Sequence, residues 1–125
     1  MTQATQKIQL DWGMCRPNTW CPLSTVDLDH EAFGTGGVYV IWHGGTPART
    51  VRVGQAAVIR DRLASHRDDP DIQAYQRQGM LYVTWAQVSA GQRDGIERYL
   101  SEQLQPLVGE RYPEALPTPV NLPGG

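Results

Sequence analysis

The sequence lacks a long apolar segment. No run of about 18 consecutive apolar residues occurs, which argues against a transmembrane helix. The polar residues 1–10 show neither the basic nor the apolar region of a secretory signal, so we expect a soluble, cytoplasmic protein. A chain of 125 residues suits one compact domain that buries roughly two thirds of its unfolded surface, so its core needs no disulfide or metal.

Cysteine is scarce. Cys15 and Cys21 are separated by five residues, and no further cysteine completes a zinc quartet. We expect both thiols to be reduced and to have no role. Two alternatives stay open. One is a zinc site completed by His30 and His43, whose spacing matches no common zinc pattern. The other is a disulfide, which is uncommon in cytosolic proteins.

Lysine is nearly absent, and arginine supplies the positive charge. Lys7 is the single lysine among 11 basic residues. The formal net charge of -2 and the pI near 5.8 argue against a broad nonspecific nucleic-acid surface. A local basic face is still expected, because five arginines fall within residues 49–67. They are Arg49, Arg52, Arg60, Arg62 and Arg67.

The hydrophobic pattern divides the chain. Residues 1–35 have no sustained period, and we expect an arm that packs on a domain formed by residues 36–125 and covers one sheet edge. Residues 36–42 and 50–54 are β-branched and aromatic with turn residues between them, which predicts a hairpin. Residues 80–88 predict a third strand.

Helices are expected between and after these strands. Good helix formers occupy residues 55–67, and shorter or later helices are predicted over residues 71–78 and 92–105. The proline-rich residues 107–125 should run extended over the surface. This order predicts the α+β class, with a central three-stranded, mainly antiparallel sheet flanked by helices.

The first long helix carries a polar pair beside its apolar stripe. Arg62 and His66 are four residues apart, so they share one side of the helix at the border of that stripe. A cation and an imidazole held there can converge on one anion. The alternative is an arginine whose stem covers the core, with a histidine favoured by the helix C-terminal dipole.

Two further residues are candidates for chemistry. The last helix places Glu97 at the margin of its apolar stripe, where a carboxylate can hold Mg²⁺ together with waters and phosphate oxygens. The alternative for Glu97 is a solvated carboxylate that pairs with Arg93. Tyr39 lies in the first strand of the hairpin, and its alternative role is packing in the core.

Taken in chain order, these residues form a pattern over residues 36–123. It comprises Gly37-Val38-Tyr39, Arg52-Val53-Gly54, Arg62, His66, Glu97 and Asn121. The pattern resembles the GIY-YIG nuclease family. The short motifs are common individually, but their spacing and order agree with the strands and helices predicted independently.

The resemblance implies a metal-dependent DNA endonuclease, a phosphodiester hydrolase that uses Mg²⁺ or Mn²⁺ in a small GIY-YIG-like domain. By similarity, Tyr39 takes a proton from the attacking water, and Arg62 stabilises the phosphate. Glu97 anchors the divalent cation, and His66 assists by hydrogen bonding or by relaying the proton. Arg52, Arg60 and Asn121 are expected to bind the substrate.

Two departures from the family pattern keep an alternative open. Arg52 replaces the tyrosine of the second motif, and Asn121 follows Pro106 at a longer distance than in several family members. The alternative is a nucleic-acid-binding or protein-interaction module without turnover. The arm and tail then offer contact surfaces for a protein partner. The sequence predicts neither the oligomeric state nor the preferred DNA.

Overall fold

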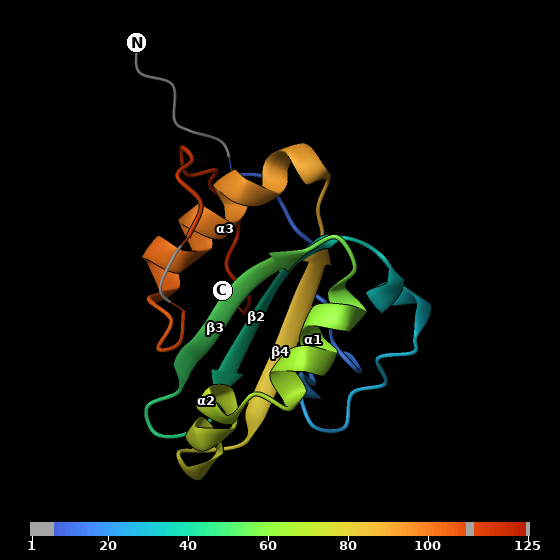
Figure 1. Ribbon diagram of the computed structural model, residues 1–125, viewed down its shortest axis with the longest axis vertical. Coiled ribbons are helices and arrows are strands. Elements are labelled where there is room, and N and C mark those ends of the chain that lie inside the picture. Colours follow the sequence, from blue (N-terminus) through green and yellow to red (C-terminus); the bar gives the residue numbers. More distant parts are fainter. Residues whose placement is uncertain (1–6, 110–111, 125) are drawn as a thin grey trace.

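The computed structural model describes residues 7–109 and 112–124. Residues 1–6 of the expected arm and residues 110, 111 and 125 of the expected tail lie outside the described residues. The sheet is antiparallel, with the strand order β1-β4-β2-β3, and helices pack on it (Figure 1). The predicted α+β class is confirmed.

The sheet has four strands, one more than the sequence predicts. The three expected strands are β2 (Gly37–His43), β3 (Arg49–Ala56) and β4 (Leu81–Gln87), and the added edge strand is the short β1 (Cys21–Pro22). The central strand β2 pairs with β3 on one side and with β4 on the other. Strand β3 therefore forms one edge of the sheet.

The pairing of β2 with β3 fixes which way the side chain of Arg52 points, and the register shifts next to this residue. Ile41 pairs with Arg52, whereas the next residue, Trp42, pairs with Thr50, so Val51 lies between the two pairs as a bulge. Directly opposed residues share one face of a sheet, and residues two apart on a strand do so as well. Arg52 therefore lies on the same face as Tyr39.

Helices cover both faces of the sheet. Helix α1 (Ile59–Arg67) lies in front of the strands in Figure 1, and α3 (Ala90–Leu104) packs against the other face of β2 and β3. The core on the α1 side includes Tyr39, Ile41, Ile59, Leu63 and Ile72, and the core on the α3 side includes Val38, Val40, Val53, Ile96 and Leu100. Each fully buried aliphatic side chain contributes about 1.5–3 kcal/mol relative to an exposed one. In the described part of the chain, no helix is both long and apolar enough to cross a membrane.

The boundaries of all three predicted helices differ from the sequence prediction. The helix predicted over residues 92–105 is α3, which begins at Ala90 and ends at Leu104. The helix predicted over residues 55–67 starts at Ile59, because Gln55 and Ala56 complete the pairing of β3 with β2. The helix predicted over residues 71–78 is a short α2 (Pro70–Gln73) followed by the 3₁₀-helix η2 (Ala74–Arg77). Pairing with the central strand outweighs the good helix propensity of Gln55 and Ala56.

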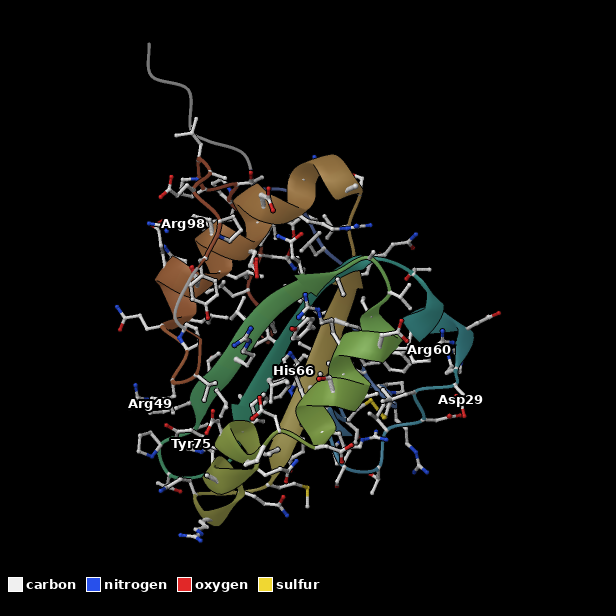
Figure 2. All side chains as sticks on the ribbon, viewed as in Figure 1. Asp29, Arg49, Arg60, His66, Tyr75 and Arg98 are labelled. Carbon is white, nitrogen blue, oxygen red and sulfur yellow. A yellow bond between two sulfur atoms is a disulfide. The ribbon has the colours of Figure 1, made fainter. Side chains whose placement is uncertain are left out.

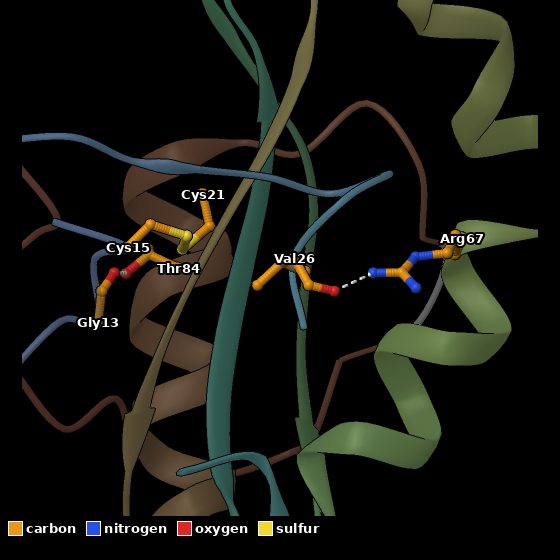
Figure 3. The surroundings of a disulfide bond; sticks show 6 residues. All are labelled: Gly13, Cys15, Cys21, Val26, Arg67 and Thr84. Atoms are coloured by element: carbon orange, nitrogen blue, oxygen red, sulfur yellow. Dashed lines mark hydrogen bonds between the residues drawn. A yellow bond between two sulfur atoms is a disulfide. The ribbon is translucent and has the colours of Figure 1, made fainter. Parts of the chain in front are cut away.

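The expectation of reduced cysteines is wrong, because Cys15 and Cys21 form a disulfide (Figure 3). A tight turn brings the two residues together. Arg16 and Thr19 bond to each other through their backbones, and Asn18 adopts the left-handed conformation with φ 62°. The same geometry excludes the zinc alternative, because both sulfurs are bonded to each other.

The arm packs against the sheet edge and α1. Strand β1 extends the sheet beside β4, which confirms the predicted cover over one edge. Arg67 of α1 donates from Nε to the carbonyl of Leu23 at 2.9 Å. It also donates from Nη2 to the carbonyl of Val26 at 2.7 Å (Figure 3). Arg67 therefore holds the arm and is not part of a free basic surface.

The C-terminal segment is anchored at both of its described ends. Leu107 and Val108 donate backbone hydrogen bonds to the carbonyls of Thr50 and Val51 on the outer edge of β3. Further on, Thr118 donates to the carbonyl of Gly95 in α3 at 2.9 Å. The segment therefore passes from the edge of β3 to α3.

Candidate active site

A cleft lies at the β3 edge of the sheet. It has a volume of about 460 Å³, and residues from β2, β3, α1, α3 and the C-terminal segment line it. They are Tyr39, Arg52, Gly54, Gln55, Arg62, Glu97, Tyr112 and Pro113. Three of the four predicted catalytic residues, Tyr39, Arg62 and Glu97, thus come together in one cleft.

Tyr39 reaches the cleft because of Gly54. Tyr39 is 1% exposed and lies opposite Gly54 across the β2–β3 pair. A Cβ atom at position 54 would collide with the ring and hydroxyl of Tyr39. The phenol therefore lies across the backbone of Gly54, and glycine is required by this close approach.

His66 lies behind Tyr39 and bonds to it. The Tyr39 hydroxyl oxygen is 2.6 Å from Nε2 of His66, whose side chain lies between α1 and the sheet (Figure 2). Burial, helped by the charges of Arg52 and Arg62, lowers the pKa of His66 to about 4. At neutral pH the imidazole is therefore uncharged.

The environment of Tyr39 favours a protonated phenol. Burial raises the pKa of Tyr39, and this effect outweighs the opposing charges of Arg52 and Arg62. The neutral phenol of Tyr39 and the neutral imidazole of His66 are joined by one hydrogen bond. Nδ1 of His66 is buried and has no hydrogen-bond partner among the residues that the structure describes. Which of the two atoms donates in this hydrogen bond depends on the tautomer of His66.

Glu97 approaches the cleft from the other face of the sheet. Gln55 of β3 points toward α3 and donates from Nε2 to Oε2 of Glu97 at 3.1 Å and to Oδ1 of Asp94 at 2.6 Å. Burial raises the pKa of Glu97, while the hydrogen bond from Gln55 and the charge of Arg52 oppose this rise. The cleft therefore wraps around the edge strand, with Tyr39 and Glu97 entering from opposite faces.

The donor set at Glu97 fits a divalent cation of the Mg²⁺ type. Within residues 7–109 and 112–124, no group of three His, Cys, Asp or Glu side chains gathers as a closed metal cage. Mg²⁺ does not need such a cage, because it binds through one or two carboxylates and keeps several waters or phosphate oxygens. Glu97 offers such a carboxylate in an open cleft, and Gln55, which bonds to it, also bonds to Asp94 outside the lining.

The five clustered arginines do not form one face. Arg52 and Arg62 line the cleft. Arg60 is exposed on the far side of α1 from His66 and lies 3.5 Å from Asp61, while Arg49 lies at the start of β3 (Figure 2). The structure therefore does not bring Arg60 to the cleft, because the helical rotation of two residues points it away from Arg62.

Asn121 also lies outside the cleft. Its Oδ1 accepts a hydrogen bond from the backbone N–H of Leu10 at 2.6 Å, and its Nδ2 donates to the carbonyl of Leu10 at 3.1 Å. Its own carbonyl accepts from the indole of Trp12 at 2.9 Å. Asn121 joins the C-terminal segment to the arm, so the structure does not support the expected substrate contact.

Three residues of the cleft are missing from the sequence prediction, namely Gln55, Tyr112 and Pro113. Gln55 follows Gly54 directly, but the pattern assigns it to the start of a helix. Tyr112 belongs to the proline-rich segment, where no period or motif distinguishes it. The position of Gln55 beside the glycine is a usable signal, whereas the position of Tyr112 depends on the path of the tail.

The cleft combines groups suited to phosphate chemistry. Two guanidinium groups can bind a phosphate, a carboxylate can hold a divalent cation, and the phenol–imidazole pair can accept a proton. Comparison of the chain with protein-family models, curated proteins and solved structures finds no match.

Proposed function

We propose that the protein is a metal-dependent DNA endonuclease of the GIY-YIG type, which hydrolyses a phosphodiester bond with water. The observation that carries the proposal is the meeting of Tyr39, Arg62 and Glu97 in one cleft, with His66 bonded to Tyr39. These side chains come from β2, α1 and α3. Their convergence supplies a proton acceptor, a cation and a metal ligand at one place.

Tyr39 and His66 are assigned to the attacking water. As the water oxygen forms its bond to phosphorus, its proton passes to the Tyr39 oxygen, and the hydroxyl proton of Tyr39 passes to Nε2 of His66. The 2.6 Å separation of these two atoms and the neutral state of His66 support this relay. The charge of Arg52 opposes the rise that burial causes in the pKa of Tyr39.

Arg62 and Arg52 are assigned to the phosphate. Negative charge grows on the phosphoryl oxygens during attack, and guanidinium groups bind such oxygens with paired hydrogen bonds. Arg62 projects from α1 and Arg52 from β3 into the same cleft. Their positions allow them to hold the phosphate beside the Tyr39 hydroxyl.

Glu97 is assigned to Mg²⁺ or Mn²⁺, with Gln55 orienting its carboxylate. When bound, the ion supplies positive charge that stabilises the departing oxygen.

Under this proposal, the macromolecular partner of the protein is DNA. The arm remains the candidate surface for a protein partner, and its described part is held to the domain by β1 and Arg67.

The proposal is tested by the nicking of supercoiled plasmid with Mg²⁺. We expect wild-type protein to nick the plasmid and EDTA to stop the reaction. Glu97→Gln should abolish nicking, whereas Glu102→Gln, an exposed residue of the same helix that pairs with Arg98, should retain it. Likewise, Arg62→Ala should abolish nicking, whereas Arg60→Ala should retain it. Absence of metal-dependent nicking by the wild type would contradict the proposal.

A binding module without turnover is the second candidate. Arg52 favours it, because this arginine stands where the family motif has a tyrosine and adds positive charge to the cleft. In that case, the protein binds a labelled DNA duplex with an affinity that Arg52→Ala and Arg62→Ala reduce. It then produces no nicked plasmid with Mg²⁺ or Mn²⁺.

The cytoplasmic location of the protein stays a prediction that is independent of the proposed activity. The Cys15–Cys21 disulfide is of a kind common in oxidising compartments. Rapid alkylation of thiols in freshly lysed cells distinguishes the two cases. Labelling of both cysteines supports the cytoplasm, and protection of both contradicts it.

A further inference from the structure

Two hydrogen-bond donors in the cleft are buried and unused. Nε of Arg52 and the hydroxyl of Tyr112 both lack a hydrogen-bond partner among residues 7–109 and 112–124. Both residues line the same cleft. Buried polar groups in folded proteins are nearly always paired, so two unpaired donors at one cleft indicate a ligand with acceptor atoms.

The C-terminal segment places Tyr112 beside Arg52. The preceding residues are fixed by the bond from Val108 to the carbonyl of Val51 at 2.8 Å, and the following ones by the bond from Thr118 to Gly95. Gly109 has φ +124°, a conformation that favours glycine. A Cβ atom at position 109 would lie 2.6 Å from the Tyr112 hydroxyl and 3.3 Å from Nη1 of Arg52. Gly109 thus packs against both groups and leaves room for them.

The charge states of the two groups define the ligand. Burial raises the pKa of Tyr112 more strongly than the charge of Arg52 lowers it, so the phenol keeps its proton. Arg52 is a cation with donors and no acceptor. An anion with exposed oxygen acceptors satisfies both donors and complements the charge of Arg52.

We propose that Tyr112 and Arg52 form a binding pair for a non-bridging oxygen of a phosphate group. The choice of a DNA phosphodiester as the ligand rests on the proposed function, whereas the phosphate chemistry rests on the two donors themselves. Tyr112 is then a substrate-binding residue contributed by the tail. The tail serves as one wall of the cleft.

The test is an NMR titration without metal, in EDTA. The Arg52 Nε–H signal is assigned by its loss in Arg52→Lys and followed while inorganic phosphate or a short DNA oligonucleotide is added. We expect the signal to shift with the ligand. Tyr112→Phe should weaken binding about tenfold through the loss of one hydrogen bond to a charged group. Tyr82→Phe, on β4 away from the cleft, should bind as the wild type does.

The outcomes separate this pair from the endonuclease proposal. Tighter binding of the oligonucleotide assigns the pair to a phosphodiester, and binding of inorganic phosphate alone assigns it to a free phosphate. An unmoved Arg52 signal, or equal affinities for wild type and Tyr112→Phe, overturns the proposal. If the plasmid is not nicked but the titration depends on Tyr112, the endonuclease fails and the phosphate pair stands.

Discussion

The hydroxyl oxygen of Tyr39 lies 2.6 Å from Nε2 of His66, and both side chains are almost fully buried. This contact joins the central strand to α1 behind the cleft. It also links Tyr39, which is proposed to face the attacking water, with the imidazole of His66, which is uncharged at neutral pH.

Replacing Tyr39 by Phe tests the proton acceptor. Tyr39→Phe removes the hydroxyl and should lower the nicking rate about 10²- to 10⁴-fold, the usual contribution of general base catalysis. It also leaves Nε2 of His66 buried without its present partner, at a cost of about 1–3 kcal/mol of unfolding free energy. Nicking kinetics and urea unfolding measure the two effects.

Tyr82→Phe is the matched control for Tyr39→Phe. Tyr82 is partly exposed and stacks on Trp42, away from the cleft. This variant should nick at the wild-type rate. A Tyr39→Phe protein that folds and nicks as fast as the control would exclude Tyr39 as the proton acceptor.

The low pKa of His66 predicts a pH-dependent stability. The folded pKa of about 4 lies below the ordinary value of 6.5, so between these values the unfolded chain binds a proton that the folded protein does not. Stability should be fully present above pH 6.5 and fall as the pH drops toward 4, by on the order of 3 kcal/mol in total from this group. Urea unfolding across this range measures the loss.

His66→Gln should remove this part of the pH dependence. His30→Gln, an exposed position in the arm, should keep it. The titration of the His66 ring by NMR gives the same information directly, with an expected midpoint near pH 4. A midpoint at or above 6.5 would show that the imidazole is not held neutral by burial.

Gly54→Ala tests the path of Tyr39 over the backbone. The added methyl group would collide with the phenol, so we expect a loss of about 1–3 kcal/mol of stability. Nicking should fall with it, because the hydroxyl is displaced. Gly91→Ala, where a Cβ meets nothing within 4 Å in α3, should be neutral or stabilising by up to about 1 kcal/mol. Equal stabilities for the two variants would contradict the close approach.

Asn121→Ala separates structure from chemistry. The amide makes two hydrogen bonds to Leu10, and their loss should lower stability by about 1–3 kcal/mol. At a temperature where the variant is folded, its kcat should equal that of the wild type. A folded variant with normal stability and reduced kcat would show that Asn121 contacts the substrate.

Much of the fold could be predicted from local patterns. The hairpin, the third strand, α1 and α3 follow from β-branched runs and from helical periods, because these elements bury one face each. Strand β1 could not be predicted, since two residues carry no period and pair only because β4 offers a free edge. The Cys15–Cys21 bond likewise depends on the turn at Asn18.

The site could be predicted in part, because spacing on strands and helices fixes the direction of side chains. The pattern identified Tyr39, Arg62, His66 and Glu97 as one group, and the structure brings the first, second and fourth to the cleft with His66 behind. It could not locate Tyr112, whose position depends on tertiary anchors at both ends of the segment. Arg60 belongs to the arginine cluster that predicts a basic face, and Asn121 is expected there from similarity alone.

The most direct test of the metal-dependent cleft is a crystal of the protein soaked in Mn²⁺, examined by anomalous diffraction. We predict an anomalous peak at the carboxylate of Glu97, inside the cleft lined by Tyr39 and Arg62, and loss of that peak in Glu97→Gln. Absence of manganese at Glu97 in the wild type, or manganese bound at a site remote from the cleft, would contradict the account.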